Sequence, residues 1–400
     1  MIVILTGPGM GFPNGTASTA RVTLYARGLI EQGKDVYVLC LGPSEYPNKK
    51  ILNQQFKGVK DGIPFEYSCG TTLRGRNRFQ QSLLVLMGLI IGVKRFCELQ
   101  AQFGVEAALL YSDRFIPTVL FWVTAKLCKS VYISERSEMP FLQLKRNWWA
   151  NLFIYFYTHT VYKLYDGVIV ISNYLYDYMK VRIRADTKIV KIPILVNLDS
   201  FADTKTVDDL PEKYVAYCGE FNQQKDGILT LIKAFSLVCA EFPGFRLVLI
   251  GDSNSARERK IFTSYVSELG ITNKVIFTGS VSRDEVPKYL IGATVLALAR
   301  PSSLQANAGF PTKLGEFLAT GKPVIMTRVG EITKYLDDGI NAFLIPPDNV
   351  DALAESLRYV FSHPEQSIKI GQMGQGVAFR NFDYRENGKR LSEFIRRLGK

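Results

Sequence analysis

The sequence predicts an α/β protein with two doubly wound Rossmann-like domains facing a central cleft. Three observations predict this fold class. Short apolar runs rich in β-branched residues alternate with longer amphipathic stretches, as in parallel sheets covered by helices on both faces. Several of the apolar runs end in loops that contain glycine. The alternation stops in a polar segment at 195–211 and then restarts, and 400 residues suffice for two cores.

The first half of the chain shows apolar runs with the length of buried strands. We expect these strands at 2–6, 36–40, 107–111, 131–134, 167–171 and 188–192. The amphipathic stretches between them predict helices at 18–32, 80–102, 118–128, 146–165 and 174–181. The first run has no basic residues before it and continues into a glycine loop, so we interpret it as a strand and not as a signal peptide.

The second half repeats the pattern. Its expected strands are 214–218, 246–250, 274–278, 294–299, 323–327 and 342–345. Its expected helices are 227–242, 256–269, 283–290, 312–320 and 350–362, followed by a basic amphipathic helix at 384–398. We therefore expect one domain at 1–197, a second at 198–382, and a final segment at 383–400 that packs back on the first domain.

The composition excludes several classes of protein. The six cysteines include no CxxC pair, which argues against a disulfide framework or a zinc site and favours the cytoplasm. With two histidines, a histidine-based metal site is not expected either. The net charge is +12, of which +10 comes from residues 1–200, where 24 Lys and Arg residues face 14 Asp and Glu residues. No nucleic-acid-binding pattern accompanies this charge, so we expect no metal, no cofactor and no nucleic-acid partner.

The most informative segment is Ala308–Thr327, with the sequence AGFPTKLGEFLATGKPVIMT. A lysine beside a helix N-terminus favours a phosphate group, because free N–H groups and the helix dipole both attract an anion. Glu316 lies one helical turn after Lys313 and can accept hydrogen bonds from a sugar diol. Phosphate next to a diol describes a nucleotide. The loop residues expected to line this site are Gly309, Phe310, Pro311 and Thr312.

Two further glycine loops follow predicted strands and precede predicted helices. The loop at 6–17 (TGPGMGFPNGTA) brings Gly15 and Thr16 to the helix start, where backbone N–H groups can face a ligand. A tight turn of any Rossmann-like unit explains it equally well. The loop at 218–227 (CGEFNQQKDG) carries Lys225 ahead of a helix, where it can reach a diphosphate or remain a solvated surface lysine.

Residues 309–319 (GFPTKLGEFLA) and 321–324 (GKPV) resemble the donor-site signature of retaining, nucleotide-sugar-dependent glycosyltransferases of family four, which have the type B fold. Further segments match the family in order and spacing: 166–172 (DGVIVIS), 192–201, 218–235, 247–252 (LVLIGD) and 275–279 (VIFTG). The resemblance covers nearly the whole chain, and it is more specific in the second half.

This resemblance implies a transfer of sugar from a UDP- or GDP-sugar to a glycan or lipid-linked acceptor, with retention of configuration, in polysaccharide or glycolipid synthesis. The second domain would bind the donor, with Lys225 and Lys313 at the diphosphate and Glu316 at the ribose. The first domain would hold the acceptor, and its glycine loop with Gly15 and Thr16 would reach over the donor phosphates.

The chain departs from the family pattern at three places. Ala308 stands where many members carry a glutamate that faces the donor sugar, and Glu220 stands where many carry an arginine. The segment 134–138 (SERSE) occupies the loop in which members carry a histidine. Two alternatives therefore stay open: a nucleotide-sugar epimerase on the same architecture, and a non-catalytic member that binds nucleotide sugars.

Catalysis with retention needs no strong protein base, since the departing phosphate can take the acceptor proton. Glu135 and Glu138 are nevertheless candidate catalytic residues, because they follow a predicted strand and can position the acceptor or act as a base. Equally, they can form ion pairs with Arg136 and nearby lysines.

Two segments of the first half combine apolar and basic residues. The longest apolar run, 83–93, lies between Arg78 and Lys94, and the segment 141–165 combines Lys145 and Arg146 with many aromatic residues. At 11 residues, the run is too short to span a bilayer, which takes about 20. Either these segments rest on the anionic inner face of the cell membrane, as in a peripheral protein, or they form buried helices with basic ends in solvent.

Overall fold

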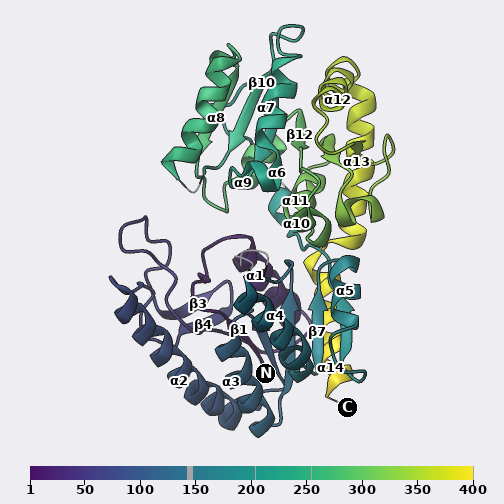
Figure 1. Ribbon diagram of the computed structural model, residues 1–400. Coiled ribbons are helices and arrows are strands. Elements are labelled where there is room, and N and C mark those ends of the chain that lie inside the picture. Colours follow the sequence, from purple (N-terminus) through teal and green to yellow (C-terminus); the bar gives the residue numbers. More distant parts are fainter. Residues whose placement is uncertain (142–146, 203, 254, 400) are drawn as a thin grey trace. The chain divides into compact units, whose positions relative to one another are not determined.

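The computed structural model describes residues 1–141, 147–202, 204–253 and 255–399 (Figure 1). It consists of two compact units. Unit 1 contains Met1–Pro193 and Tyr384–Lys400, and unit 2 contains Ile194–Asp383. The chain thus divides after Pro193 and Asp383, where the sequence prediction divides it after 197 and 382. Lys145 and Arg146 lie outside the described residues.

Unit 1 is built on an eight-stranded sheet within its described residues, in the order β3-β4-β2-β1-β5-β6-β7-β8. Its strands are β1 (Ile2–Thr6), β2 (Val36–Cys40), β3 (Lys57–Lys60), β4 (Ile63–Tyr67), β5 (Ala107–Tyr111), β6 (Val131–Arg136), β7 (Gly167–Val170) and β8 (Lys188–Lys191). All pairs are parallel except β3 with β4. The sequence prediction lacks β3 and β4. The exposed edge strand β3 (KGVK) carries no apolar run, and β4 (IPFEY) alternates buried and half-buried residues.

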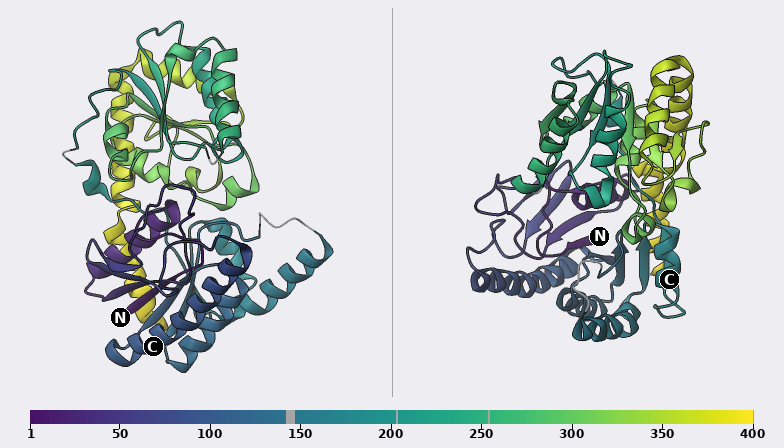
Figure 2. Two further views of the ribbon diagram at one scale, coloured as in Figure 1. Left: turned by 90° about the vertical axis from the view of Figure 1, so that its left-hand side faces the viewer. Right: turned by 45° about the horizontal axis from the view of Figure 1, so that its top comes forward.

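Helices cover both faces of this sheet. They are α1 (Ala17–Ile30), α2 (Arg78–Phe103), α3 (Phe115–Leu127), α4 (Trp148–Thr160), α5 (Asn173–Lys180) and α14 (Tyr384–Leu398), with the short 3₁₀ helix η1 (Val161–Leu164). Figure 2 shows α1 and α14 on one face and α2, α3 and α4 on the other. This follows from right-handed crossovers, since the chain moves outward from β1 to β2 and then in the opposite direction from β5 to β7.

The C-terminal helix α14 packs on α1 through two glycines. A side chain on Gly28 would collide with the carbonyl oxygen of Tyr384, and one on Gly388 would collide with the backbone of Gly28. The two helix backbones therefore approach closely, as they do only where side chains are absent. This contact places the end of the chain in unit 1.

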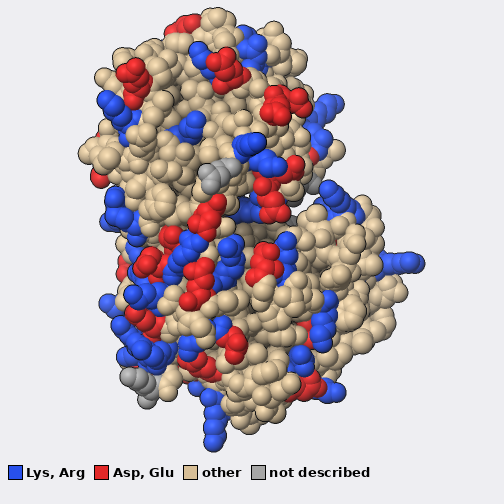
Figure 3. Space-filling view, turned by 180° about the vertical axis from the view of Figure 1, so that it is seen from behind, with Lys and Arg blue, Asp and Glu red and all other residues tan. Residues whose placement is uncertain are grey.

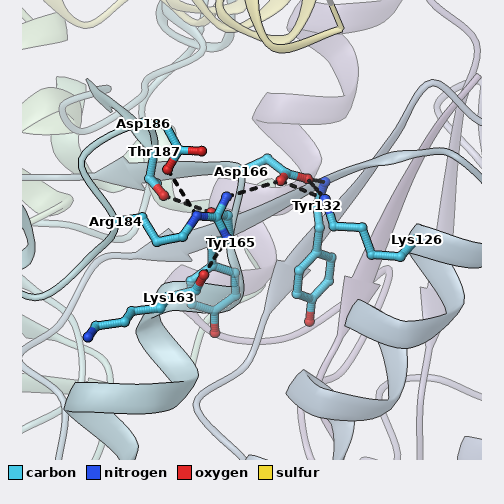
Figure 4. A network of polar contacts seen from close by, with 8 residues as sticks. All are labelled: Lys126, Tyr132, Lys163, Tyr165, Asp166, Arg184, Asp186 and Thr187. Atoms are coloured by element: carbon cyan, nitrogen blue, oxygen red, sulfur yellow. Dashed lines mark hydrogen bonds and ion pairs between the residues drawn. The ribbon is translucent and has the colours of Figure 1, made fainter.

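The amino ends of the unit 1 strands are joined by a polar network around Asp166, shown in Figure 4. The Asp166 carboxylate accepts hydrogen bonds from Lys126 Nζ at 2.8 and 3.0 Å and from the Tyr132 backbone N–H at 2.9 Å. Arg184 approaches the same carboxylate at 3.6 Å and also pairs with Asp186 at 2.9 Å. The two basic side chains and the two carboxylates compensate one another in charge, so contacts within unit 1 hold the amino ends of these strands.

Unit 2 is built on a six-stranded parallel sheet within its described residues, in the order β11-β10-β9-β12-β13-β14. Its strands are β9 (Tyr214–Cys218), β10 (Arg246–Ile250), β11 (Val275–Gly279), β12 (Val295–Leu298), β13 (Val324–Thr327) and β14 (Phe343–Ile345). Strands β9, β12 and β13 are buried along their whole length, as their apolar sequences predict. Every strand predicted from the sequence, in both units, is present within two residues at either end.

Unit 2 also contains helices that the sequence prediction includes in part. They are α6 (Gln223–Asp226), α7 (Ile228–Ser236), α8 (Ala256–Glu268), α9 (Val286–Ile291), α10 (Leu304–Ala308), α11 (Lys313–Ala319), α12 (Val350–Ser362) and α13 (Pro364–Asn381), with the 3₁₀ helices η2 (Leu198–Phe201), η3 (Thr272–Lys274) and η4 (Gly330–Lys334). The prediction lacks α6, α10 and α13. Helix α13 contains three glycines, which lower helix propensity, but Gly371 and Gly374 pack on neighbouring backbone where a side chain would collide.

The positive charge of the chain lies in unit 1. Unit 1 holds 30 Lys and Arg residues against 15 Asp and Glu residues, a net of +15, and unit 2 holds 19 against 22, a net of −3. The two values add to the total of +12. Figure 3 shows the face of unit 1 that carries α1 and α14, where basic and acidic side chains are interspersed.

Candidate functional site

The candidate site of unit 2 lies at the carboxyl ends of β9 and β12, which are neighbours in the sheet. From β9 the chain continues to β10 on one side, whereas β12 lies on the other side. Loops that leave adjacent strands in opposite directions open a crevice, and ligands of doubly wound sheets bind there. The two segments selected from the sequence of this unit follow these two strands.

Lys313, the first residue of α11, contacts two buried side chains from the β9 side. Its Nζ lies 2.5 Å from Asp226 Oδ2 and 2.7 Å from the Tyr217 hydroxyl oxygen. The Tyr217 hydroxyl donates to the same Asp226 oxygen at 2.8 Å. The Asp226 side chain is 3% exposed and the Lys313 side chain 17%. A lysine of one loop is thus held by an aspartate and a tyrosine of the other.

Two glycines make this arrangement possible. Gly219 has a φ of +145°, and a side chain there would collide with Lys313 Cε and Nζ, so the lysine crosses directly over the loop backbone. Gly227 has a φ of +67° and ends α6. A side chain at this position would collide with the carbonyl group of Ala299, at the end of β12. Both loops therefore depend on glycine for their close approach.

Burial and neighbouring charges act on Lys313 in opposite directions. Burial lowers the pKa of its ammonium group, while the Asp226 carboxylate raises that pKa and the Arg300 guanidinium lowers it. Burial also holds the pKa of the Tyr217 hydroxyl well above its ordinary value, so this group stays protonated. Lys313 is consequently a poorly hydrated cation for which Asp226 supplies the counter-charge.

Glu316 lies one turn after Lys313 on α11. Its side chain is 13% exposed and forms an ion pair with Arg283, which precedes α9 and has a 56% exposed side chain. An exposed arginine thus covers the carboxylate expected to bind a ribose. A ligand diol can reach Glu316 only if it replaces or shares this contact.

Lys225 belongs to the four-residue helix α6, directly before Asp226. Its backbone N–H donates to Asn222 Oδ1 at 3.0 Å, and this N-cap sets the start of the helix. The lysine side chain is half-buried. Lys225 and Lys313 therefore both lie at Asp226. Lys225 directly precedes Asp226 in the sequence, and Lys313 forms an ion pair with it.

The four loop residues before Lys313 have different surroundings. Phe310 is buried and stacks on Tyr335 with 5.3 Å between ring centroids, so it anchors the loop in the core. The Gly309 backbone N–H donates to the Gln305 carbonyl at 3.0 Å. Pro311 is buried, and Thr312 is half-buried at the start of α11. The structure thus makes Phe310 and Pro311 packing residues that fix the position of Lys313.

Sequence reasoning missed Asp226, Tyr217 and Arg283 as members of this site. Asp226 lies in the selected loop at 218–227 and is adjacent to Lys225, so a signal existed for it. The sequence offers no comparable signal for Arg283, because its partner Glu316 is 33 residues away.

The remaining candidates belong to unit 1. Gly15 and Thr16 are exposed at the start of α1, and the Thr16 hydroxyl lies 3.0 Å from that of Ser18. A side chain on Gly15 would collide with Thr19 Oγ1, which in turn donates to the Gly11 carbonyl at 2.7 Å. The glycine at this position therefore keeps the loop compact.

Glu135 is buried at the end of β6, and Glu138 is exposed two residues beyond the strand. Glu135 Oε1 accepts a hydrogen bond from Arg21 Nε at 2.6 Å, and both side chains are at most 2% exposed. Glu135 therefore forms an ion pair with Arg21 and not with the expected Arg136, which pairs with Asp113 and donates to the Tyr165 hydroxyl at 2.9 Å. Burial raises the pKa of Glu135 and Arg21 opposes this shift.

The described residues contain no group of three or more His, Cys, Asp and Glu side chains with the geometry of a metal site. They also contain no helix long and apolar enough to cross a membrane.

Residues 212–363 match the family model of glycosyl transferases group 1. The match lies within unit 2 and covers less than half of the chain. The matched range includes β9, the loop with Lys225 and Asp226, and α11 with Lys313 and Glu316. The candidate site therefore lies inside the segment that matches the glycosyltransferase model.

Two curated proteins that are similar to this chain are also named as sugar transferases. The D-inositol 3-phosphate glycosyltransferase of Corynebacterium urealyticum is 29% identical over 193 residues, which are 47% of this chain and 44% of that protein. The GDP-mannose-dependent alpha-(1-6)-phosphatidylinositol monomannoside mannosyltransferase of Mycolicibacterium smegmatis is 24% identical over 240 residues, 58% of this chain and 62% of that protein. The matches thus span about half the length of these relatives. Both are transferases, so the epimerase alternative is not favoured.

The whole chain is similar in structure to HepE of Anabaena, which was solved in complex with UDP. The TM-score is 0.71 at 16% identity, and the likeness covers 99% of both chains. At this identity the likeness concerns the fold alone. It confirms two Rossmann-like α/β domains of the glycosyltransferase type B architecture.

Proposed function

We propose that this protein is a glycosyltransferase that moves a sugar from a nucleoside-diphosphate sugar to a glycan or lipid-linked acceptor. The observation that carries the proposal is the half-buried Lys313 at the crevice between β9 and β12, within the segment that matches the group 1 model. A cation with little hydration at the ligand-binding edge of a doubly wound sheet is suited to a diphosphate.

In this proposal Lys313 and Lys225 bind the diphosphate. A diphosphate carries more negative charge than the single Asp226 carboxylate and can share the Lys313 ammonium with it, as in a charge-assisted hydrogen-bond network. Glu316 binds the ribose hydroxyls in place of, or together with, Arg283. The released arginine then adds a positive charge near the donor.

We assign the protein to family four and to the retaining mechanism, on the resemblance of residues 309–324 to that family's donor signature. In retention, the bond between the sugar and the diphosphate breaks while the acceptor oxygen attacks from the same face. The departing phosphate takes the acceptor proton, and Lys313 stabilises the charge on the leaving group. The pairing of Glu135 with Arg21 is consistent with such a mechanism, which needs no carboxylate base.

The donor is a UDP- or GDP-sugar, and the acceptor is a glycan or a lipid-linked molecule. HepE binds UDP, and the name of the Mycolicibacterium relative specifies GDP-mannose and a phosphatidylinositol acceptor. We propose that the chain works in glycolipid or polysaccharide synthesis as a peripheral protein of the cytoplasmic membrane face. A membrane-bound acceptor is also consistent with the positive charge of unit 1.

Thermal stabilisation by nucleoside diphosphates tests the donor site. UDP or GDP is expected to raise the melting temperature of the wild-type protein, and Lys313→Met to lower the affinity by about tenfold or more, as for a charged hydrogen bond worth about 1.5–3 kcal/mol. Lys369→Met, at an exposed position on α13, is the matched control. Since Lys313→Met leaves Asp226 buried without its counter-ion, Lys313→Met/Asp226→Asn separates lost binding from lost stability. Unchanged affinity in both Lys313 variants would refute the proposal.

A further inference from the structure

An unusual feature of unit 1 is the outer surface of α2, α3 and α4. A helix packed on a sheet normally buries an apolar stripe and exposes polar residues. These three helices expose apolar residues at helical spacing as well. The interpretation of residues 83–93 as a buried helix is therefore wrong for much of the run: Gly88, Leu89 and Gly92 face inward, while other residues of the run are exposed.

Helix α2 carries the longest stripe. Phe79, Leu83, Leu86 and Ile90 follow the spacing i, i+4, i+7 and i+11, so they lie along one face of the helix. Their exposed fractions reach 78% for Phe79 and 61% for Ile90. The inward face of the same helix packs on β2, where a side chain on Gly88 would collide with the Leu41 carbonyl. The stripe is thus turned away from the sheet.

Helix α3 continues this surface. Ile116, Val123 and Leu127 are exposed at i, i+7 and i+11, and Leu127 is 80% exposed. The two helices are in contact, since the rings of Phe96 in α2 and Phe121 in α3 lie 6.3 Å apart. The exposed stripes of α2 and α3 therefore belong to neighbouring helices of one layer.

Helix α4 adds aromatic residues. Trp148 and Trp149 are 65% and 69% exposed, and Leu152, Tyr155 and Phe156 follow on the same side. Phe115 of α3 contacts Phe153 and Phe156 of α4, with ring centroids 6.5 and 6.1 Å apart. We call the exposed stripes of α2 (79–90), α3 (116–127) and α4 (148–156) the three-helix face. Figure 2 shows that it lies on the opposite side of the sheet from α1 and α14.

The charge on these helices selects the partner. Helices α2, α3 and α4 contain one acidic residue, Glu98, whose carboxylate is 3.1 Å from Arg95 and 3.9 Å from Lys94. Unit 1 as a whole has a net charge of +15. A dimer joined through this face would bring two positively charged copies of unit 1 together, and their repulsion disfavours the dimer. An anionic surface is attracted instead.

We propose that the three-helix face docks on the headgroup and acyl boundary of an anionic bilayer. Exposed apolar stripes with tryptophan and tyrosine are the side chains that enter this boundary, and positive charge strengthens the binding. The helices lie along the surface rather than across it, in agreement with the finding that no described helix can span a membrane. The inference locates the membrane contact of the proposed function, but it needs no catalytic activity.

Vesicle sedimentation with the full chain tests this face. The wild-type protein is expected to pellet with phosphatidylglycerol–phosphatidylcholine vesicles and far less with phosphatidylcholine alone. Leu86→Glu/Ile90→Glu on α2 and Trp148→Ala/Trp149→Ala on α4 are each expected to weaken binding by about tenfold or more. Ile368→Glu/Met373→Glu on α13 of unit 2 is the matched control, because these residues are similarly exposed (46% and 56%).

Tryptophan fluorescence gives a second measurement. All three tryptophans of the chain, Trp122, Trp148 and Trp149, belong to α3 and α4, so a blue shift on addition of vesicles reports this face directly. An unchanged melting temperature shows that each variant is folded. Wild-type protein that stays in the supernatant, or a face variant that binds like the wild type, overturns the proposal. So does a dimer that the α2 substitutions abolish without any binding to vesicles. A wild-type protein that binds no nucleoside diphosphate would refute the proposed donor site, but it would not change the outcome of the vesicle measurements.

Discussion

At the scale of single residues, the contact between Lys313 and Asp226 combines a functional and a structural role. Asp226 is almost fully buried and pairs with a lysine that solvent reaches only in part. Removing one partner of a buried pair costs more than the pair itself contributes, because the other charge is left without compensation. Stability measurements can therefore detect this pair independently of ligand binding.

Lys313→Met should destabilise unit 2 by about 2–4 kcal/mol, since Asp226 then keeps a buried charge without a cation. Lys313→Met/Asp226→Asn should recover at least half of this loss, because the amide is neutral and can still bond to Tyr217. The urea midpoints of wild type, both single variants and the double variant measure the coupling. Strictly additive effects would show that the two side chains do not depend on each other.

The thiols of the chain should differ strongly in reactivity. Burial raises the pKa of Cys40 and of Cys218 to about 12, so at pH 8 about one molecule in ten thousand carries the reactive thiolate at either position. Cys97 is exposed. Iodoacetamide at pH 8 should alkylate Cys97 while Cys40 and Cys218 remain unmodified, as peptide mass spectrometry can show. Labelling of the two buried thiols should rise about tenfold per pH unit, and rapid labelling at pH 8 would contradict their burial.

At the scale of elements, the crossing of α1 and α14 explains why the last residues of the chain return to unit 1. A Cβ atom on Gly388 would lie 2.5 Å from Gly28 Cα. Alanine favours a helix by about 1 kcal/mol over glycine, but here the neighbour is backbone and cannot move aside. The collision should therefore outweigh the gain in helix propensity.

Gly388→Ala is expected to lower the stability of unit 1 by about 1–3 kcal/mol and to make α14 more accessible to proteases. Gly244→Ala is the control, because a Cβ atom there has no neighbour within 4 Å. Melting temperatures and limited proteolysis measure both effects. Equal stability of the two variants would mean that the helices can separate at little cost.

At the scale of the whole molecule, unit 2 is a continuous segment with its own sheet and core, whereas unit 1 is assembled from two segments. The site residues Lys225, Lys313 and Glu316 and their partners Asp226 and Arg283 all belong to unit 2. Donor binding should accordingly be separable from the rest of the chain.

A fragment of residues 194–383 should fold cooperatively and be stabilised by the same nucleoside diphosphate as the full chain. Circular dichroism and thermal melting with UDP and GDP provide the measurement. The same fragment with Lys313→Met serves as the control for specific binding. A folded fragment that no longer responds to the nucleotide would show that unit 1 contributes to donor affinity.

Much of the fold could be predicted from the sequence because buried parallel strands are apolar along their length, as in Tyr214–Cys218 and Ile2–Thr6. The predictions failed where local composition and tertiary packing disagree. The glycines of α13 lower helix propensity, although Gly371 and Gly374 pack closely on neighbouring backbone. The exposure of Phe79 and Ile90 could not be predicted either, since an apolar stripe at helical spacing has the same pattern whether it is covered or not.

The sequence by itself determined where all strands but β3 and β4 lie, that the chain has two Rossmann-like domains, and which segment carries Lys313 and Glu316. Tertiary structure decided that Asp226, 87 residues away, holds Lys313, that Arg283 covers Glu316, and that Arg21 binds Glu135. The reason is physical. Periodicity and loop composition act over a few neighbouring residues, so they can be recognised in the sequence. Contacts between distant side chains depend on the order of the strands in the sheet, which brings the ends of β9 and β12 together.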